Sequence, residues 1–540
     1  MKKIVFLLFI ILVSSHVVIS QEVNKHISFV SIYDYLDELA NMQIIELNSV
    51  VKPYSRQLIY EKLHDAEGKL ELLTKRQQKD LAFFLKDYNK EVIPNKKFKR
   101  RVDLFYYRDS LFQFTVNPIL GYSYSKNENG QANQRWNGLE MNGSIGKSFG
   151  FYFSLRDNGI YNVLSTPNYL MQLPGANYKP YQGTNNARTD FDEARGGVSY
   201  AWKWGSISLL KDNFVWGNNY NGATIFSGRQ PSFAYLSFKL KPNKWFEFNY
   251  IHGSLVSQVL DSSKTYGTGS GLRKSFFPKY VAANLFTIKP YKSLYISLGN
   301  SIIYSDKNIQ PIYLIPFMFF KSADRTMNGA GSNALGENSQ IFLDVSCRVL
   351  KKTHLYGTVF IDEVNVGKMF DKKNQTNLMS FKAGLRVTNL IKNTAFTIEY
   401  TRTNPWVYVH PISTTTFASN NYNMGHYLGQ NAQEIYIGLK VKPLRGLAIN
   451  LSYTQAIKGP TKDFQQLNGV NNVAGAIFME DVFWMNNTTS IKAYYEILND
   501  VFIFAEGSYS NISGIATPIY TPDFYKGKTK TINLGMNIGF

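Results

Sequence analysis

The chain has 540 residues, a formal charge of +20 at pH 7 and one cysteine, Cys347. A single cysteine excludes a disulfide scaffold and a cysteine-rich metal site, and 44% apolar residues exclude a disordered polyelectrolyte. The only long apolar run is N-terminal, which excludes a multi-span helical membrane protein. The 36 Tyr and 38 Phe are typical of a large antiparallel β protein at a lipid interface.

Residues 1–20 have the pattern of a secretory signal peptide. Lys2 and Lys3 precede a ten-residue apolar core, and Ser20 places a small residue before the expected cleavage site. Ten apolar residues are about half of what a spanning helix needs. We therefore expect export through a cleaved signal peptide.

Residues 21–95 predict a small periplasmic helical domain. Three stretches have the apolar spacing of amphipathic helices, the first with Ser31 as its expected N-cap. The second helix is expected to begin at Ser55. Thr74 and Gln77 form a capping-box pattern at the start of the third.

A basic run follows the predicted helices, at Lys96, Lys97, Lys99, Arg100 and Arg101. It is interpreted as a solvated linker, with contact to anionic lipid headgroups as the alternative.

Residues 96–540 alternate between apolar and polar residues with a period of two, which predicts β-strands. Ile491 and Ala493 alternate with Lys492 and Glu496, and this strand is expected to form a hairpin with the next one. An apolar face opposite a charged face is typical of a transmembrane barrel with lipid outside and water inside. We predict a mainly β fold, an antiparallel transmembrane barrel of about 18 strands.

The end of the chain supports the same fold. Residues 532–540 are apolar at every second position and end at Phe540, which resembles the last strand of a bacterial outer-membrane barrel and its assembly signal. Long loops are expected at 157–195, 305–340, 402–433 and 456–489, on the extracellular side. The predicted location is the bacterial outer membrane.

The charge is concentrated in the barrel. The first 101 residues carry +5, so +15 falls on residues 102–540. A basic lumen or outer rim would attract an acidic polymer, and contact with lipopolysaccharide phosphates would explain the charge equally well.

No catalytic motif is found in the sequence. Residues 143–148 resemble the end of a phosphate-binding loop, but Met141 replaces its first glycine and the segment lies in a predicted hairpin. We expect neither an enzyme nor a cofactor or metal site.

One stretch and its later matches carry a resemblance to a known family. The pattern comprises Trp216, Gly217, Ser227, Arg229, Pro231 and His252, followed by Asp362 and Glu363 at a predicted strand end. It resembles the Wzi-type capsule assembly family of outer-membrane barrels, in a Bacteroidota-like branch. The sequence departs from the family pattern at Asn218 and Asn219.

The resemblance implies an 18-stranded barrel with a periplasmic helical bundle that holds capsular polysaccharide without cleaving it. Aromatic rings in the long loops are the candidate sugar-binding residues: Trp406, Tyr408, His410, Tyr422, Tyr427 and Trp484. Asp362 and Glu363 either fix a hydrogen-bond network with Arg and Lys in the lumen or face the ligand.

The expected partners are an acidic surface polysaccharide, outer-membrane lipid, lipopolysaccharide and the barrel-assembly machinery, with no nucleic acid. Two alternatives stay open. The chain could be a structural component of a gliding-motility or surface-adhesin machinery, with motility or secretion proteins as partners. It could also be an anion-preferring diffusion channel, although low conductance is expected.

Overall fold

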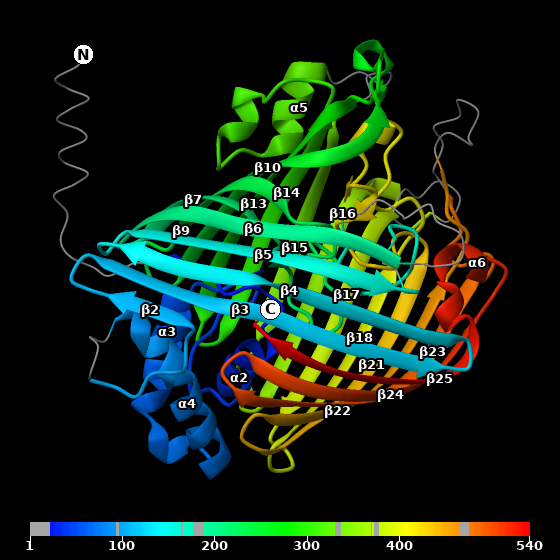
Figure 1. The fold of residues 1–540 in the computed structure, drawn as a ribbon. Coiled ribbons are helices and arrows are strands. Elements are labelled where there is room, and N and C mark those ends of the chain that lie inside the picture. The colour runs from blue at the N-terminus through cyan, green and yellow to red at the C-terminus, as the bar shows by residue number, and fades with distance from the viewer. Residues whose placement is uncertain are drawn as a thin grey trace, which may run out of the picture.

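The computed structural model describes residues 22–92, 97–163, 166–176, 188–329, 336–364, 366–368, 370–371, 377–463 and 475–539. Within them the chain forms a closed antiparallel barrel of 18 strands preceded by a helical segment, which confirms the predicted fold class (Figure 1). The expected signal peptide and Phe540 lie outside the described residues. None of the described helices is long and apolar enough to cross a membrane.

The barrel strands follow one another around the wall, and the barrel closes where the last strand pairs with the first. They are β3 (Phe112–Asn127), β4 (Gly130–Ile145), β5 (Phe149–Tyr161), β6 (Arg188–Trp202), β7 (Gly205–Asp212), β9 (Phe233–Leu240), β10 (Phe246–Leu260), β13 (Phe276–Tyr291), β14 (Leu294–Ser305), β15 (Asn338–Cys347), β16 (Thr353–Val364), β17 (Asn377–Thr388), β18 (Thr394–Thr403), β21 (Ala432–Leu444), β22 (Leu447–Lys458), β23 (Trp484–Leu498), β24 (Val501–Ser513) and β25 (Gly527–Ile538). The short β2 (Phe105–Arg108) also pairs with β3.

Several strands are longer than their apolar patterns indicate. β5 continues to Tyr161 and β6 begins at Arg188, so the loop expected at 157–195 is shorter than predicted. The added residues are mostly polar, but their backbone groups complete the ladder between the two strands.

The β23–β24 hairpin shows how the strand faces are used. Lys492 lies opposite Glu506 on the inner face, with 3.6 Å between their charged atoms. Ile491 and Ile503 lie on the outer face and are 53% and 48% exposed. The predicted outward apolar face and the inward charges of this hairpin are confirmed, and the inner face also carries the aromatic rings of Tyr494, Phe502 and Phe504.

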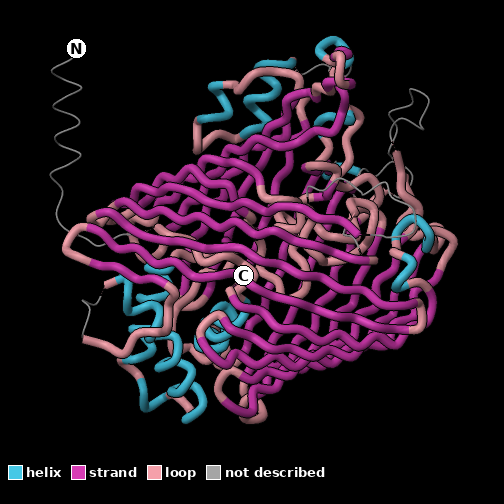
Figure 2. The backbone as a smooth tube through the Cα atoms, viewed as in Figure 1, coloured by secondary structure: helices cyan, strands magenta, loops and turns pink. Residues whose placement is uncertain are grey.

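The helical segment lies at the end of the barrel where the connections are short, the periplasmic side in bacterial barrels (Figure 2). It consists of α2 (Val30–Asn41), α3 (Arg56–Glu67) and α4 (Lys75–Tyr88). Ser55 caps α3, and Thr74 forms the predicted capping box. Ser31 is not the first N-cap, because Phe29 is buried in the helical core and α2 begins directly after it.

Smaller elements lie in the lumen and loops. They are β1 (Val51–Lys52), β8 (Val215–Trp216), β11 (Tyr266–Thr268), β12 (Gly271–Arg273), α5 (Phe320–Asn328), β19 (Ala418–Ser419), β20 (Tyr422–Asn423) and α6 (Thr517–Tyr520).

Helix α2 presents an acidic face to a basic patch of the barrel wall. Arg348 Nη2 lies 2.8 Å from an Asp37 oxygen, and Arg386 Nη2 lies 2.9 Å from Asp34. Lys442 Nζ lies 2.7 Å from Asp34 and 3.0 Å from Glu38. Much of the luminal positive charge is therefore neutralised by the chain itself.

The pKa of Asp34 reflects this surrounding. Burial raises the pKa of the Asp34 carboxyl, but Lys440, Lys442 and Arg386 outweigh burial and hold the pKa well below its usual value. The ion pairs between α2 and the wall are thus present at neutral pH.

Removing the central cation of this contact should loosen the helical segment. Arg348 also donates to Asn41 Oδ1 at 2.6 Å and to Ser49 Oγ at 2.9 Å, so Arg348→Ala leaves several buried acceptors without a donor. We expect the free energy that holds α2 in place to fall by about 3 to 5 kcal/mol, measured by hydrogen exchange of the α2 amides.

Lys62→Ala is the control, since Lys62 pairs on the outer side of α3 with Asp65, which is 51% exposed. Its effect should stay below about 1 kcal/mol. Equal protection of α2 in wild type and Arg348→Ala would contradict the anchoring role.

Candidate functional site

The connection between β7 and β9, residues 213–232, folds into the barrel. Its strand β8 pairs with β1 of the N-terminal segment, with Trp216 opposite Val51. Gly217 has φ of +103°, a conformation that favours glycine, and its N–H donates to Val50 O at 2.8 Å. The Asn218 N–H reaches Asp344 Oδ2 on the barrel wall at 2.9 Å. This inward segment is thus fixed both to the helical segment and to the wall.

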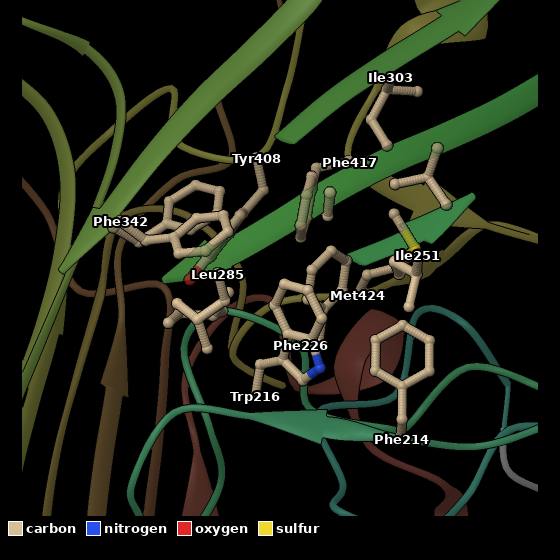
Figure 3. Packing of buried hydrophobic residues seen from close by; sticks show 14 of the residues in the cluster. Phe214, Trp216, Phe226, Ile251, Leu285, Ile303, Phe342, Tyr408, Phe417 and Met424 are labelled. Atoms are coloured by element: carbon tan, nitrogen blue, oxygen red, sulfur yellow. The ribbon is translucent and has the colours of Figure 1, made fainter. Parts of the chain in front are cut away.

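The inward segment and the loop 404–431 together fill one half of the lumen with an apolar core (Figure 3). Trp216 is 2% exposed, and its ring lies 5.4 Å from that of Phe226 and 6.1 Å from that of Phe342 on β15. Phe417 of the loop packs against Phe226 with ring centroids 5.3 Å apart. This half of the barrel is a packed interior.

The six aromatic positions expected to bind sugar are mainly buried. Trp406 and Tyr408 belong to the luminal core, at 5% and 4% exposure. Tyr427 and Trp484 come together in a second apolar cluster at the outer loops. Tyr422 is 1% exposed.

The polar atoms of these side chains hold the loops together. Tyr408 OH donates to Thr224 O at 2.7 Å, and Trp484 Nε1 donates to Thr521 Oγ1 at 2.8 Å. His410, which is half-buried, lies 2.7 Å from Thr415 Oγ1. A sugar-stacking role for these six side chains stays a prediction. The five buried ones, Trp406, Tyr408, Tyr422, Tyr427 and Trp484, expose little ring surface to a sugar.

The residues of the sequence pattern link the inward segment to neighbouring loops. Ser227 Oγ donates to Met424 O at 3.1 Å, and Arg229 Nε donates to Met171 O at 2.8 Å. The Arg229 guanidinium also lies 5.3 Å from the centre of the Tyr422 ring. Pro231 is buried two residues before β9.

The remaining pattern residues lie on the wall. His252 Nε2 is 2.7 Å from Tyr304 OH. Asp362 accepts from the Tyr408 N–H at 2.8 Å and so anchors the loop 404–431, whereas Glu363 is exposed. Asp362 thus belongs to a luminal hydrogen-bond network, but its hydrogen-bond partners among the described residues are the Tyr408 backbone and the Gln340 amide instead of the expected Arg and Lys.

The other half of the lumen contains a cavity of about 590 Å³. It lies between α2, the inward segment and the inner faces of β4, β18 and β21–β25. Aromatic and amide side chains line it together: Trp136, Tyr220, Tyr436, Tyr494, Phe502, Phe504, Asn450 and Asn537. Its volume falls within the range of about 300–1,000 Å³ that small-molecule sites occupy.

The cavity is also lined by cations. Lys440 and Arg386 are paired with Asp34, and Lys492 faces Glu506. Lys52 forms no ion pair within 4 Å among the described residues. Burial lowers the pKa of the Lys52 ammonium, and nearby Asp37 partly offsets this effect. An anionic group would therefore find a positive charge here.

The second apolar cluster lies at the long-loop ends of the strands around this half of the lumen, formed by Tyr427, Leu428, Ala432, Ala456, Trp484, Ile512 and Ala516. Leu170 N–H donates to Tyr520 O at 3.0 Å, which ties the connection after β5 to the connection between β24 and β25. In the described part of the chain, no group of three His, Cys, Asp or Glu side chains is placed to hold a metal ion.

Sequence reasoning did not single out Trp136, Tyr436 or Tyr494. They lie mid-strand, and only their inward register marks them. The alternation gives that register, but it does not tell which inward residues face a cavity and which face packed protein.

No family model matches the chain, and no curated protein matches it. Among solved structures, the chain is similar to Wzi of Escherichia coli, an outer-membrane protein involved in group 1 capsule assembly and described as a carbohydrate-binding β-barrel. The TM-score is 0.57 at 12% identity, over 96% of this chain and 100% of that one.

Two further barrels have lower scores, OccAB2 of Acinetobacter baumannii and OprD of Pseudomonas aeruginosa. Both have a TM-score of 0.40, at 9% and 10% identity. The alignment with OccAB2 covers 78% of this chain and 98% of the OccAB2 chain. The alignment with OprD covers 79% of this chain and 92% of the OprD chain. The likeness to Wzi extends to the fold, so this chain has the fold of an outer-membrane β-barrel.

Proposed function

We propose that the protein is a non-enzymatic outer-membrane barrel, exported by a cleaved signal peptide, that binds an acidic surface polysaccharide and helps to attach it to the cell. The observation that carries the proposal is a filled lumen whose remaining cavity combines aromatic rings, amides and cations. Aromatic rings stack on the apolar faces of sugars, and amides and cations bind hydroxyls and carboxylates.

The fold supports the same function, because the similar barrel of Escherichia coli is described as carbohydrate-binding. In this proposal the luminal cavity receives one or a few acidic sugar residues. The buried loop aromatics, Trp406 and Tyr408 among them, keep the surrounding loops in shape.

Removing two rings of the cavity should weaken binding of acidic oligosaccharides. Trp136 and Tyr494 reach the cavity from β4 and β23. We expect Trp136→Ala with Tyr494→Ala to lower affinity about tenfold, since each aromatic contact contributes about 0.5–1.5 kcal/mol beyond its buried area. The measurement is calorimetry of the detergent-solubilised protein with size-fractionated acidic capsular oligosaccharides at low salt.

Trp245→Ala with Tyr291→Ala is the matched control, because these rings are 58% and 64% exposed at the short-turn end. Unchanged affinity in the cavity variant would place the site elsewhere. No binding by the wild-type protein would refute the proposed function itself.

The filled lumen also predicts low conductance, in contrast to an open diffusion channel. Asp212 and Phe233 are register partners, so an Asn-Gly turn can replace residues 213–232 without disturbing the ladder. In planar bilayers we expect the wild type to show little conductance and this replacement to show clearly larger openings.

The variant that lacks residues 213–232 must keep its 18-stranded barrel. This is checked by comparing the electrophoretic mobility of unheated and heated samples. A large stable pore in the wild-type protein would favour the channel alternative.

A further inference from the structure

A groove of about 1,060 Å³ runs along the barrel at its short-turn end. It lies between α4, the segment 99–104 that leads to β2, and the turns 444–445 and 497–501. The last residues of β25 and Pro118 of β3 also line it, so it lies at the seam where the barrel closes. It is separate from the luminal cavity.

The groove is strongly basic. Six basic side chains line it against a single acidic one, Asp103: Lys79, Lys86, Lys99, Arg100, Arg101 and Arg445. Asp103 is 1% exposed, and it is already bound by Lys90 at 3.1 Å and by Arg101 at 3.2 Å. Asp103 therefore neutralises only a small part of the positive charge of the groove.

The cations differ in how they are held. Arg101 is fixed by Asp103 and by Asp500, the latter at 2.5 Å. In contrast, Lys79, Lys86 and Lys99 form no ion pair within 4 Å among the described residues. Arg445 donates to the Glu496 carbonyl at 2.7 Å and lies 4.4 Å from the centre of the Phe83 ring. Four cations are thus free of carboxylates.

Exposed apolar side chains lie beside these cations. Val102 and Leu104 are 82% and 67% exposed, and Leu498 and Ile497 are 54% and 42% exposed. Ile497 lies at the end of the lipid-facing side of β23. The apolar part of the groove therefore continues the surface that contacts acyl chains, and the basic part continues the surface that contacts headgroups.

We propose that this groove is a binding site for one anionic glycerophospholipid of the periplasmic leaflet. The phosphate lies among Lys79, Lys86, Lys99 and Arg445, and an acyl chain lies on Leu104, Ile497 and Leu498. Charge complementarity selects the anionic headgroup, and the adjoining lipid-facing strand ends select a lipid over a soluble phosphate. Lys99 of the basic run is then a headgroup contact, the alternative that the sequence left open, while Lys96 lies outside the described residues.

The test is native mass spectrometry of the full-length protein in neutral detergent, with phosphatidylglycerol or phosphatidylcholine added. We expect one phosphatidylglycerol per chain and at least tenfold weaker binding of phosphatidylcholine. Lys79→Gln, Lys86→Gln and Lys99→Gln together should weaken phosphatidylglycerol binding on the order of 100-fold, since each basic residue contributes roughly fivefold. These side chains are exposed or half-buried, so the barrel should fold unchanged.

The matched control changes Lys75, Lys292 and Lys351 to Gln, three exposed lysines at the same end of the barrel but outside the groove. It removes the same charge and should leave binding unchanged. An equal loss in the control, or equal binding of the two lipids, would overturn the proposal.

A second arm separates a lipid site from a phosphate site. Val102→Ser with Leu104→Ser should weaken phosphatidylglycerol binding at least fivefold with all cations retained, and equimolar glycerol 3-phosphate should not displace the lipid. Displacement by glycerol 3-phosphate, or full binding by the serine variant, would reduce the groove to a simple anion site and refute the lipid assignment.

Discussion

An 18-stranded barrel is too wide for its own side chains to fill, and much of this structure depends on that constraint. The chain supplies the missing volume from the inward segment 213–232, from the loop 404–431 and from α2. Trp216 of the inward segment belongs to the apolar core that this segment forms with the loop 404–431 and the barrel wall. Its strand β8 also pairs with β1, which links this core to the N-terminal segment. The lumen is consequently divided into a packed half and a cavity.

The filling of the wide lumen also determines which charged side chains pair with one another. Because α2 lies across the short-turn end of the lumen, its Asp34, Asp37 and Glu38 meet Arg348, Arg386 and Lys442 of the wall. A large formal charge thus does not translate into a uniformly basic lumen. Among the described cations without an ion pair are Lys52 in the cavity and Lys79, Lys86 and Lys99 of the groove beside α4. Local excess of this kind can select a ligand, whereas a diffuse excess attracts any anion.

The aromatic residues divide in a similar way. Many lie on the outer face of the barrel or in the luminal core. Lipid contact and the packing of the inward segment and the loop 404–431 are sufficient to explain why these positions are aromatic. The rings at the cavity, Trp136 and Tyr494 among them, are the ones whose surroundings fit a sugar. The proposed polysaccharide site and the proposed lipid site are at different places and use different cations.

The sequence by itself determined the features that depend on neighbours along the chain. The alternation around Lys492, the β23–β24 hairpin and the capping box at Thr74 could all be predicted, since each follows from backbone periodicity or local hydrogen bonding. The tertiary structure decided the rest. Asp37 and Arg348 are 311 residues apart, and the burial of Trp406 depends on what crosses the lumen beside it. A period of two tells which face a side chain occupies, but only the packed barrel determines what that face meets.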